Sequence, residues 1–213
     1  SVFVHAVEFA KEHVLGEFWV DEGGGIFIGL KILGEMAAEG TNECFKQFND
    51  NGPGAPFTAN AVEQYYNTGM QNKLGIFAVD RSGKLYLMRD NAQIPPEAVP
   101  LLKIPMEQLF VEYKVTDEPH KPGEYKLNGE TVYQLGFAFF VDLEHLVGEE
   151  PVRRGFGELA RNDSRTPTSG AYAAFRKQMP SGMLQKFDKF WEERAFGGSE
   201  RLNEVKKQLG IGQ

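Results

Sequence analysis

The stretch from Val132 to Val141 limits the possible folds of this chain more than any other feature of its sequence. It is apolar on both faces, so it must lie inside the molecule with neighbours on both sides. An apolar run of this length is typical of a central β-strand. Asn128-Gly129 is the favoured pair for a type I′ turn, and it is flanked by Glu124–Leu127 and Glu130–Val141. We therefore expect a hairpin here, with the apolar run as its inner strand.

Other segments complete the predicted sheet. Leu74–Val79 and Leu85–Met88 are short apolar runs, and the turn residues Asp80 to Gly83 join them, which predicts a second hairpin. Apolar side chains alternate with polar ones from residue 109 to residue 115, which is typical of a half-buried strand. Because the connections are short, the sheet is expected to be mainly antiparallel, with about four or five strands.

Helical spacing of apolar residues dominates on both sides of this region. Before it, we expect helices over about 2–16, 26–37, 41–48 and 58–69, with the Gly23–Gly25 run interrupting the first pair. After it, residues 153–167 are polar, basic and glycine-containing, which predicts a linker or extended arm, and helices are expected at about 169–179, 181–196 and 199–209. The predicted class is therefore α+β: N-terminal helices, an antiparallel sheet and a C-terminal helical tail.

The charge of the chain is divided in the same way as its pattern. The net charge is −7, but residues 1–150 carry 23 acidic and 11 basic side chains, giving −12. Residues 151–213 carry 7 acidic and 12 basic side chains, giving +5. We therefore predict two parts, an acidic α+β core domain over 1–150 and a basic arm and helical tail over 151–213. The tail is expected to pack on the core or on a partner, because such asymmetry bears on partners.

Composition favours a cytoplasmic protein. No apolar run approaches the roughly 20 residues that a membrane-spanning helix needs, so no membrane contact is expected. The N-terminal residues have no basic segment followed by an apolar one, unlike a secretory signal. The single cysteine, Cys44, excludes an internal disulfide framework and fits a reducing compartment.

Cys44 raises the possibility of a cysteine hydrolase of peptidase or amidase type. It lies near the start of a predicted helix, where free N–H groups lower a thiol pKa, and His120 and His145 bracket the hairpin that would present a base. Glu43 beside it disfavours the thiolate, and a lone cysteine is more often a small buried hydrophobe. The catalytic set Cys44, His120 and His145 therefore stands as an alternative, and whether the chain is an enzyme is left open.

The basic arm is the stronger candidate for function. Arginines with interleaved glycine and an aromatic residue can follow a nucleic-acid backbone, although the acidic body would repel that polyanion. The same residues can dock on an acidic protein surface, of this chain or of another. We therefore predict a non-catalytic binding or assembly protein that associates with itself or with a protein partner. The predicted partner-binding residues are Arg153, Arg154, Phe156, Arg161, Arg165, Arg176 and Lys177.

A third class is a small-ligand sensing domain, in which the hairpin around Asp80–Gly83 belongs to a sheet with a ligand cavity. No metal or cofactor is predicted. His5 and His13 lie eight residues apart, which on one helix is about 12 Å, too far to share an ion. Asn49, Asp50 and Asn51 lack the alternating ligands and the distal glutamate of a calcium loop.

Overall fold

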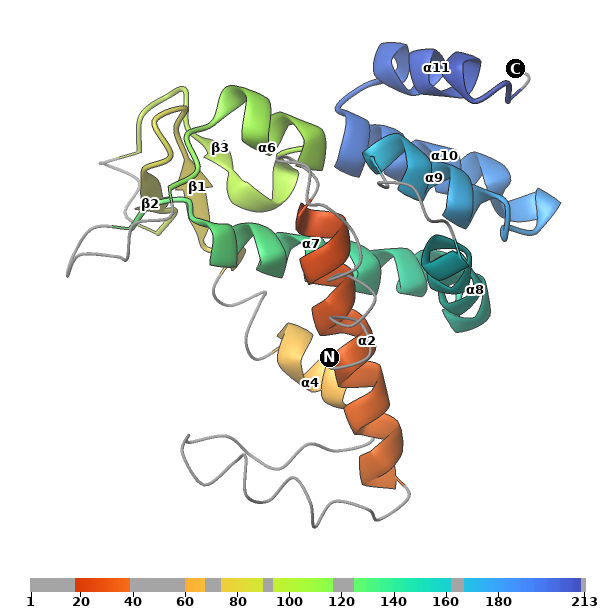
Figure 1. Cartoon of the computed structure of the whole chain (residues 1–213). Helices are drawn as coiled ribbons and strands as arrows, with labels where there is room; N and C mark the ends of the chain where they lie inside the picture. Colours follow the sequence, from red (N-terminus) through yellow and green to blue (C-terminus); the bar gives the residue numbers. More distant parts are fainter. Residues whose placement is uncertain are drawn as a thin grey trace.

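The computed structural model describes residues 18–38, 60–67, 74–89, 94–116, 125–161 and 167–211. Helices make up most of these residues, and one small sheet lies at the side of the molecule opposite the C-terminal helices (Figure 1). In chain order the elements are α2 Phe18–Ala38, α4 Ala61–Tyr65, β1 Phe77–Val79, β2 Leu85–Leu87, β3 Val99–Pro100, η4 Leu101–Lys103, α6 Met106–Glu112, α7 Gly129–Val147, α8 Glu149–Arg161, α9 Thr168–Arg176, η5 Ser181–Met183, α10 Leu184–Trp191, the π-helix η6 Glu192–Phe196 and α11 Ser199–Gln208.

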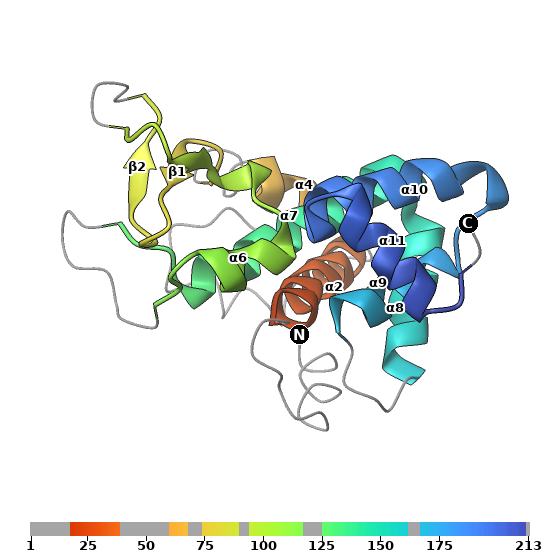
Figure 2. The same cartoon turned by 90° about the horizontal axis from the view of Figure 1, so that it is seen from above.

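The apolar run 132–141 is a helix, and the prediction of a central strand was wrong. It lies within α7, the central helix, which other elements surround (Figure 1, Figure 2). Because α7 is buried on most sides, its sequence lacks the one-sided pattern of a surface helix. Asn128 does not form a hairpin turn. Its Oδ1 accepts hydrogen bonds from the backbone N–H of Thr131 at 2.9 Å and from the Thr131 hydroxyl at 2.8 Å, which caps the helix.

Helices α2 and α7 cross at two glycines. A Cβ at Gly23 would lie 2.5 Å from the carbonyl carbon of Gly136, and a Cβ at Gly136 would lie 2.3 Å from the carbonyl oxygen of Trp19. Any larger residue at either position would separate the two backbones. The Gly23–Gly25 run therefore does not interrupt a helix, as the sequence suggested. It lies inside α2 and lets that helix approach α7 closely.

Aromatic side chains from distant parts of the chain meet around this crossing. Trp19 of α2 packs edge-on against Phe139 of α7, with ring centroids 4.8 Å apart. Trp191 of α10 packs against Phe139 at 5.0 Å and against Trp19 at 6.1 Å. All three are fully buried and belong to one hydrophobic core that includes residues on both sides of position 150. The C-terminal helices thus supply part of the core of the central helix.

The predicted hairpin at residues 74–88 is confirmed. β1 pairs antiparallel with β2, with Ala78 opposite Tyr86. In the turn, Oδ1 of Asp80 accepts from the Ser82 backbone N–H at 2.8 Å, and Gly83 takes the positive φ of 81° that glycine tolerates.

The size of the sheet was predicted wrongly. In the described residues it has three short strands in the order β2-β1-β3, rather than four or five. The alternating segment at 109–115 instead begins in helix α6, where Met106 and Leu109 are buried three residues apart and Val111 is 84% exposed. Helical spacing from Pro105 onward outweighs the alternation, since proline is favourable before the first turn of a helix.

Residues 153–167 are not a linker in their described part. They belong largely to α8, which begins at Glu149 and carries Pro151 in its first turn, where a missing N–H costs nothing. The three predicted C-terminal helices are confirmed as α9, the α10 region and α11. Helix α8 lies at the end of α7, against α9, at the edge of the molecule in both views (Figure 1, Figure 2).

Candidate interaction surface on helix α8

The inner face of α8 is part of the core. Val152, Gly155 and Leu159 are buried, at the spacing of one helix face. The ring of Phe156 stacks on Phe27 at 5.9 Å between centroids, and a Cβ at Gly155 would lie 2.1 Å from the Phe175 ring. These contacts hold the helix firmly against α2 and α9.

The outer face of α8 is charged throughout. We call it the α8 stripe, and its residues recur at helical spacing along one side of the helix: Glu150, Arg153, Arg154, Gly157, Glu158 and Arg161. The side chains of Arg153, Arg154 and Arg161 are 68%, 59% and 76% exposed. The stripe therefore presents guanidinium groups to solvent from a helix whose position is fixed by its buried face.

Ion pairs organise the stripe. Glu150 accepts hydrogen bonds from Arg153 Nε and Nη2 at 2.8 and 2.7 Å, and from Arg154 Nε at 2.8 Å. These hydrogen bonds lower the pKa of Glu150 to about 2. Glu158 accepts from Lys177 Nζ at 2.7 Å, which lowers the pKa of its carboxyl below the ordinary value. With Lys177, the stripe carries four basic and two acidic side chains, a net charge of +2.

Gly157, in the middle of the stripe, has no packing role within the described chain. A Cβ built there would meet no atom within 4 Å, in contrast to the crowded Gly155 two residues earlier. Glycine inside a helix costs about 1 kcal/mol relative to alanine. The described fold offers no compensation for that cost, and the position leaves a shallow gap between charged neighbours.

The predicted partner-binding residues are distributed over three environments. Arg153, Arg154 and Arg161 lie on the α8 stripe, and Lys177 contacts it through Glu158. Phe156 points inward and packs in the core, and Arg176 pairs with Asp188 at 2.9 Å. Arg165 lies outside the described residues. The structure thus brings together four of the seven predicted residues at the surface.

Arg176 belongs to a polar network centred on Asp188. This carboxylate accepts from Tyr172 Oη at 2.7 Å and from Arg176 Nε at 2.9 Å, and it pairs with Lys206 at 2.7 Å. Burial raises the pKa of Asp188, but the hydrogen bonds from Arg176, Lys206 and Tyr172 outweigh it and hold the pKa below the ordinary value. The network ties α9, α10 and α11 together.

Two further cations of the C-terminal part pair with carboxylates of the acidic body. Arg194 Nη1 lies 2.8 Å from Oδ2 of Asp142, and Arg201 Nε lies 2.9 Å from Oε2 of Glu107. The acidic surface offered by residues 1–150 is therefore met, at these two places, by the same chain.

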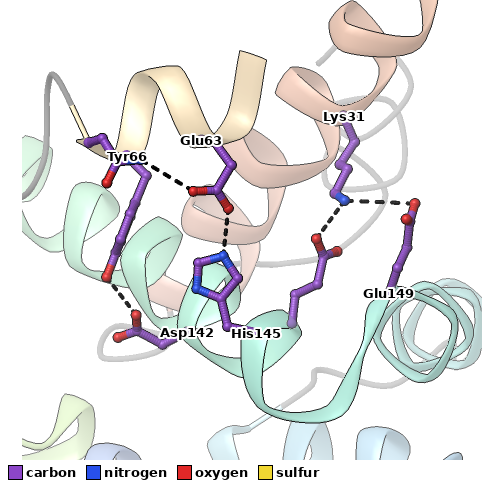
Figure 3. A network of polar contacts seen from close by, with 8 residues as sticks. Lys31, Glu63, Tyr66, Asp142, His145 and Glu149 are labelled. Carbon is purple, nitrogen blue, oxygen red and sulfur yellow. Dashed lines mark hydrogen bonds and ion pairs between the residues drawn. The ribbon is translucent and has the colours of Figure 1, made fainter. Parts of the chain in front are cut away.

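The residues predicted for a hydrolase are not assembled by the described structure. Cys44 and His120 lie outside the described residues. His145, near the end of α7, points toward Glu63 of α4, and its Nε2 lies 2.5 Å from the Glu63 carboxylate (Figure 3). Beside it the hydroxyl of Tyr66 donates to Asp142, which fixes α4 on α7 a second time. The hydrolase stays a prediction without a described site.

Sequence reasoning missed the acidic members of these arrangements. Glu150 and Glu158 follow the same three- and four-residue spacing as the arginines, so the helical period of 149–161 was the signal for the α8 stripe. Lys31 was not singled out either, yet it lies between Glu144 and Glu149 at the junction of α2, α7 and α8 (Figure 3). No local pattern announces such a contact across 113 residues of sequence.

Within the described residues, no group of three or more His, Cys, Asp or Glu side chains could hold a metal ion. Of the helices in that part of the chain, none has the length and apolarity to cross a membrane. When the chain is compared with protein-family models, with curated proteins and with solved structures, no match is found.

Proposed function

We propose that this chain is a non-catalytic binding or assembly protein that associates through the α8 stripe. The observation that carries the proposal is the set of exposed arginines held on a rigid helix with a net charge of +2. Charged groups in fixed positions speed association and fix the orientation of partners. The complement of such a surface is an ordered set of carboxylates, either on another protein or on a second copy of this chain.

The pairing of each arginine supports this role. A guanidinium already held by a neighbouring carboxylate has lost part of its conformational freedom before a partner arrives, which lowers the entropic cost of binding. Arginine also has five N–H donors in a planar fork, so the donors that Glu150 leaves unused remain available to a second carboxylate. The stripe is therefore prepared for charge-assisted hydrogen bonds from outside.

The test is the salt dependence of association. We would measure the native mass of the full chain, and its binding to a labelled polyglutamate peptide, at about 0.01 M and about 1 M salt, where screening lengths are about 30 and 3 Å. The proposal expects a higher mass or peptide binding at low salt, lost at high salt. In Arg153→Glu/Arg154→Glu, association should weaken about tenfold or more.

The matched control is Lys186→Glu/Lys189→Glu on α10, which changes the net charge by the same amount at two exposed positions away from α8. It should associate like the wild type. A wild-type chain that is monomeric at low salt and does not bind polyglutamate would contradict the proposal. Equal weakening by the control pair would show a response to overall charge and contradict the role of the stripe.

A further inference from the structure

The order of charges along the α8 stripe is complementary to its own reverse. From its N-terminal end the stripe reads Glu150, Arg153, Arg154, Gly157, Glu158, Arg161. The spacing is symmetric about the point between residues 155 and 156. When the helix is turned end to end about that point, each position of the stripe falls on another position of the stripe.

An antiparallel pair of α8 helices related by a two-fold axis therefore matches opposite charges. Glu150 lies opposite Arg161 of the partner subunit, and Arg153 lies opposite Glu158 of the partner subunit. The symmetry makes each of these pairs twice, as in any isologous interface. Arg154 lies opposite the partner subunit's Gly157, where the absent side chain leaves room for the arginine stem.

Other arrangements of the same two helices are disfavoured by charge. A parallel pair would place every side chain opposite its own copy, so that arginine faces arginine. An antiparallel pair centred on Gly157 would place Arg153 opposite Arg161 of the partner subunit. Like charges facing one another across an interface destabilise the wrong pairing, and this repulsion selects the register.

We propose that the partner of the α8 stripe is a second copy of this chain, with the two α8 helices antiparallel about a two-fold axis near residue 155. This rests on the proposed function, that the stripe is an association surface. It also gives Gly157 a role, because the helix can approach its copy most closely there. Since the matched groups are charged and exposed, the dimer is expected to form at low salt and to dissociate as salt is raised.

Charge reversal tests the pairing directly. Arg153→Glu alone and Glu158→Arg alone each place like charges opposite one another twice, so each variant should dimerise at least about tenfold more weakly than the wild type. An equimolar mixture of the two variants restores both opposite pairs, so it should form a heterodimer of wild-type strength. Native mass spectrometry at low salt distinguishes that heterodimer from either homodimer by mass, and circular dichroism checks that each variant is folded.

The pair Glu150→Arg and Arg161→Glu repeats the test at the outer positions, in case a variant at 153 or 158 does not fold. A mixture that forms no heterodimer while wild type dimerises would overturn the antiparallel register. A chain that is monomeric at low salt but binds polyglutamate through the stripe would overturn self-pairing and leave the proposed function standing. A chain that does neither would overturn both.

Discussion

At the scale of single residues, Asp188 shows how this fold uses charge internally. Its side chain is 13% exposed, and one carboxylate accepts from a tyrosine, an arginine and a lysine on three helices. Replacing it by the isosteric asparagine leaves Arg176 and Lys206 without the negative group that they face. Removing one partner of a half-buried charged pair costs more than the pair itself contributes, because the remaining charge stays poorly solvated.

We predict that Asp188→Asn lowers the free energy of unfolding by about 2 kcal/mol at pH 7. The pKa of Asp188 lies below its ordinary value of 3.8 in the folded protein, so its contribution is fully present above that pH and is lost as the pH falls further. The difference between wild type and variant in urea unfolding should therefore shrink below about pH 4.

Glu193→Gln is the control for Asp188→Asn. Its carboxylate is 60% exposed and lies 3.7 Å from Lys189, so the change should stay within about 0.5 kcal/mol. A difference between wild type and Asp188→Asn that does not change with pH would contradict the role assigned to the carboxylate charge.

At the scale of elements, the outcome of sequence prediction depended on how locally each element is determined. The β1–β2 hairpin was predictable because Asp80 and Gly83 form its turn from their own neighbourhood. Helix α7 was not, because a helix buried on most sides shows no face, and Asn128-Gly129 fits a hairpin turn as well as a helix cap. On α8 the arginines were correctly expected at the surface, but only the fold places Phe156 in the core.

Two glycines in helices give opposite predictions for the same substitution. Gly23→Ala places a methyl group 2.5 Å from the Gly136 carbonyl carbon, so it should destabilise the chain by about 2–3 kcal/mol through separation of α2 and α7. Gly157→Ala meets open space and should stabilise α8 by about 0.5–1 kcal/mol. Urea unfolding at high salt, where dimers are dissociated, measures both. Equal signs would contradict the close crossing of α2 and α7.

At the scale of the whole molecule, the C-terminal part combines two roles that the sequence presented as alternatives. Its inner side supplies the core: Trp191 and Phe175 are fully buried, and Trp191 packs against Phe139 of the central helix. Its basic groups are divided between the acidic body, through Arg194 and Arg201, and the exposed α8 stripe. The division of the chain at residue 150 follows the charge, whereas the packing continues across it.

The last prediction follows from that continuity. A chain ending at residue 150 would expose the faces of Phe139, Phe140 and Trp19 that α8, α9 and α10 cover in the full chain. Burying a large side chain is worth about 1.5–3 kcal/mol, so losing several such contacts exceeds the 5–15 kcal/mol by which domains are stable. We expect residues 1–150 alone to unfold without a cooperative transition and to bind a hydrophobic dye, whereas the full chain melts cooperatively. A cooperative melt of the fragment, measured by circular dichroism, would show instead that the acidic part folds independently and that the tail is an accessory arm.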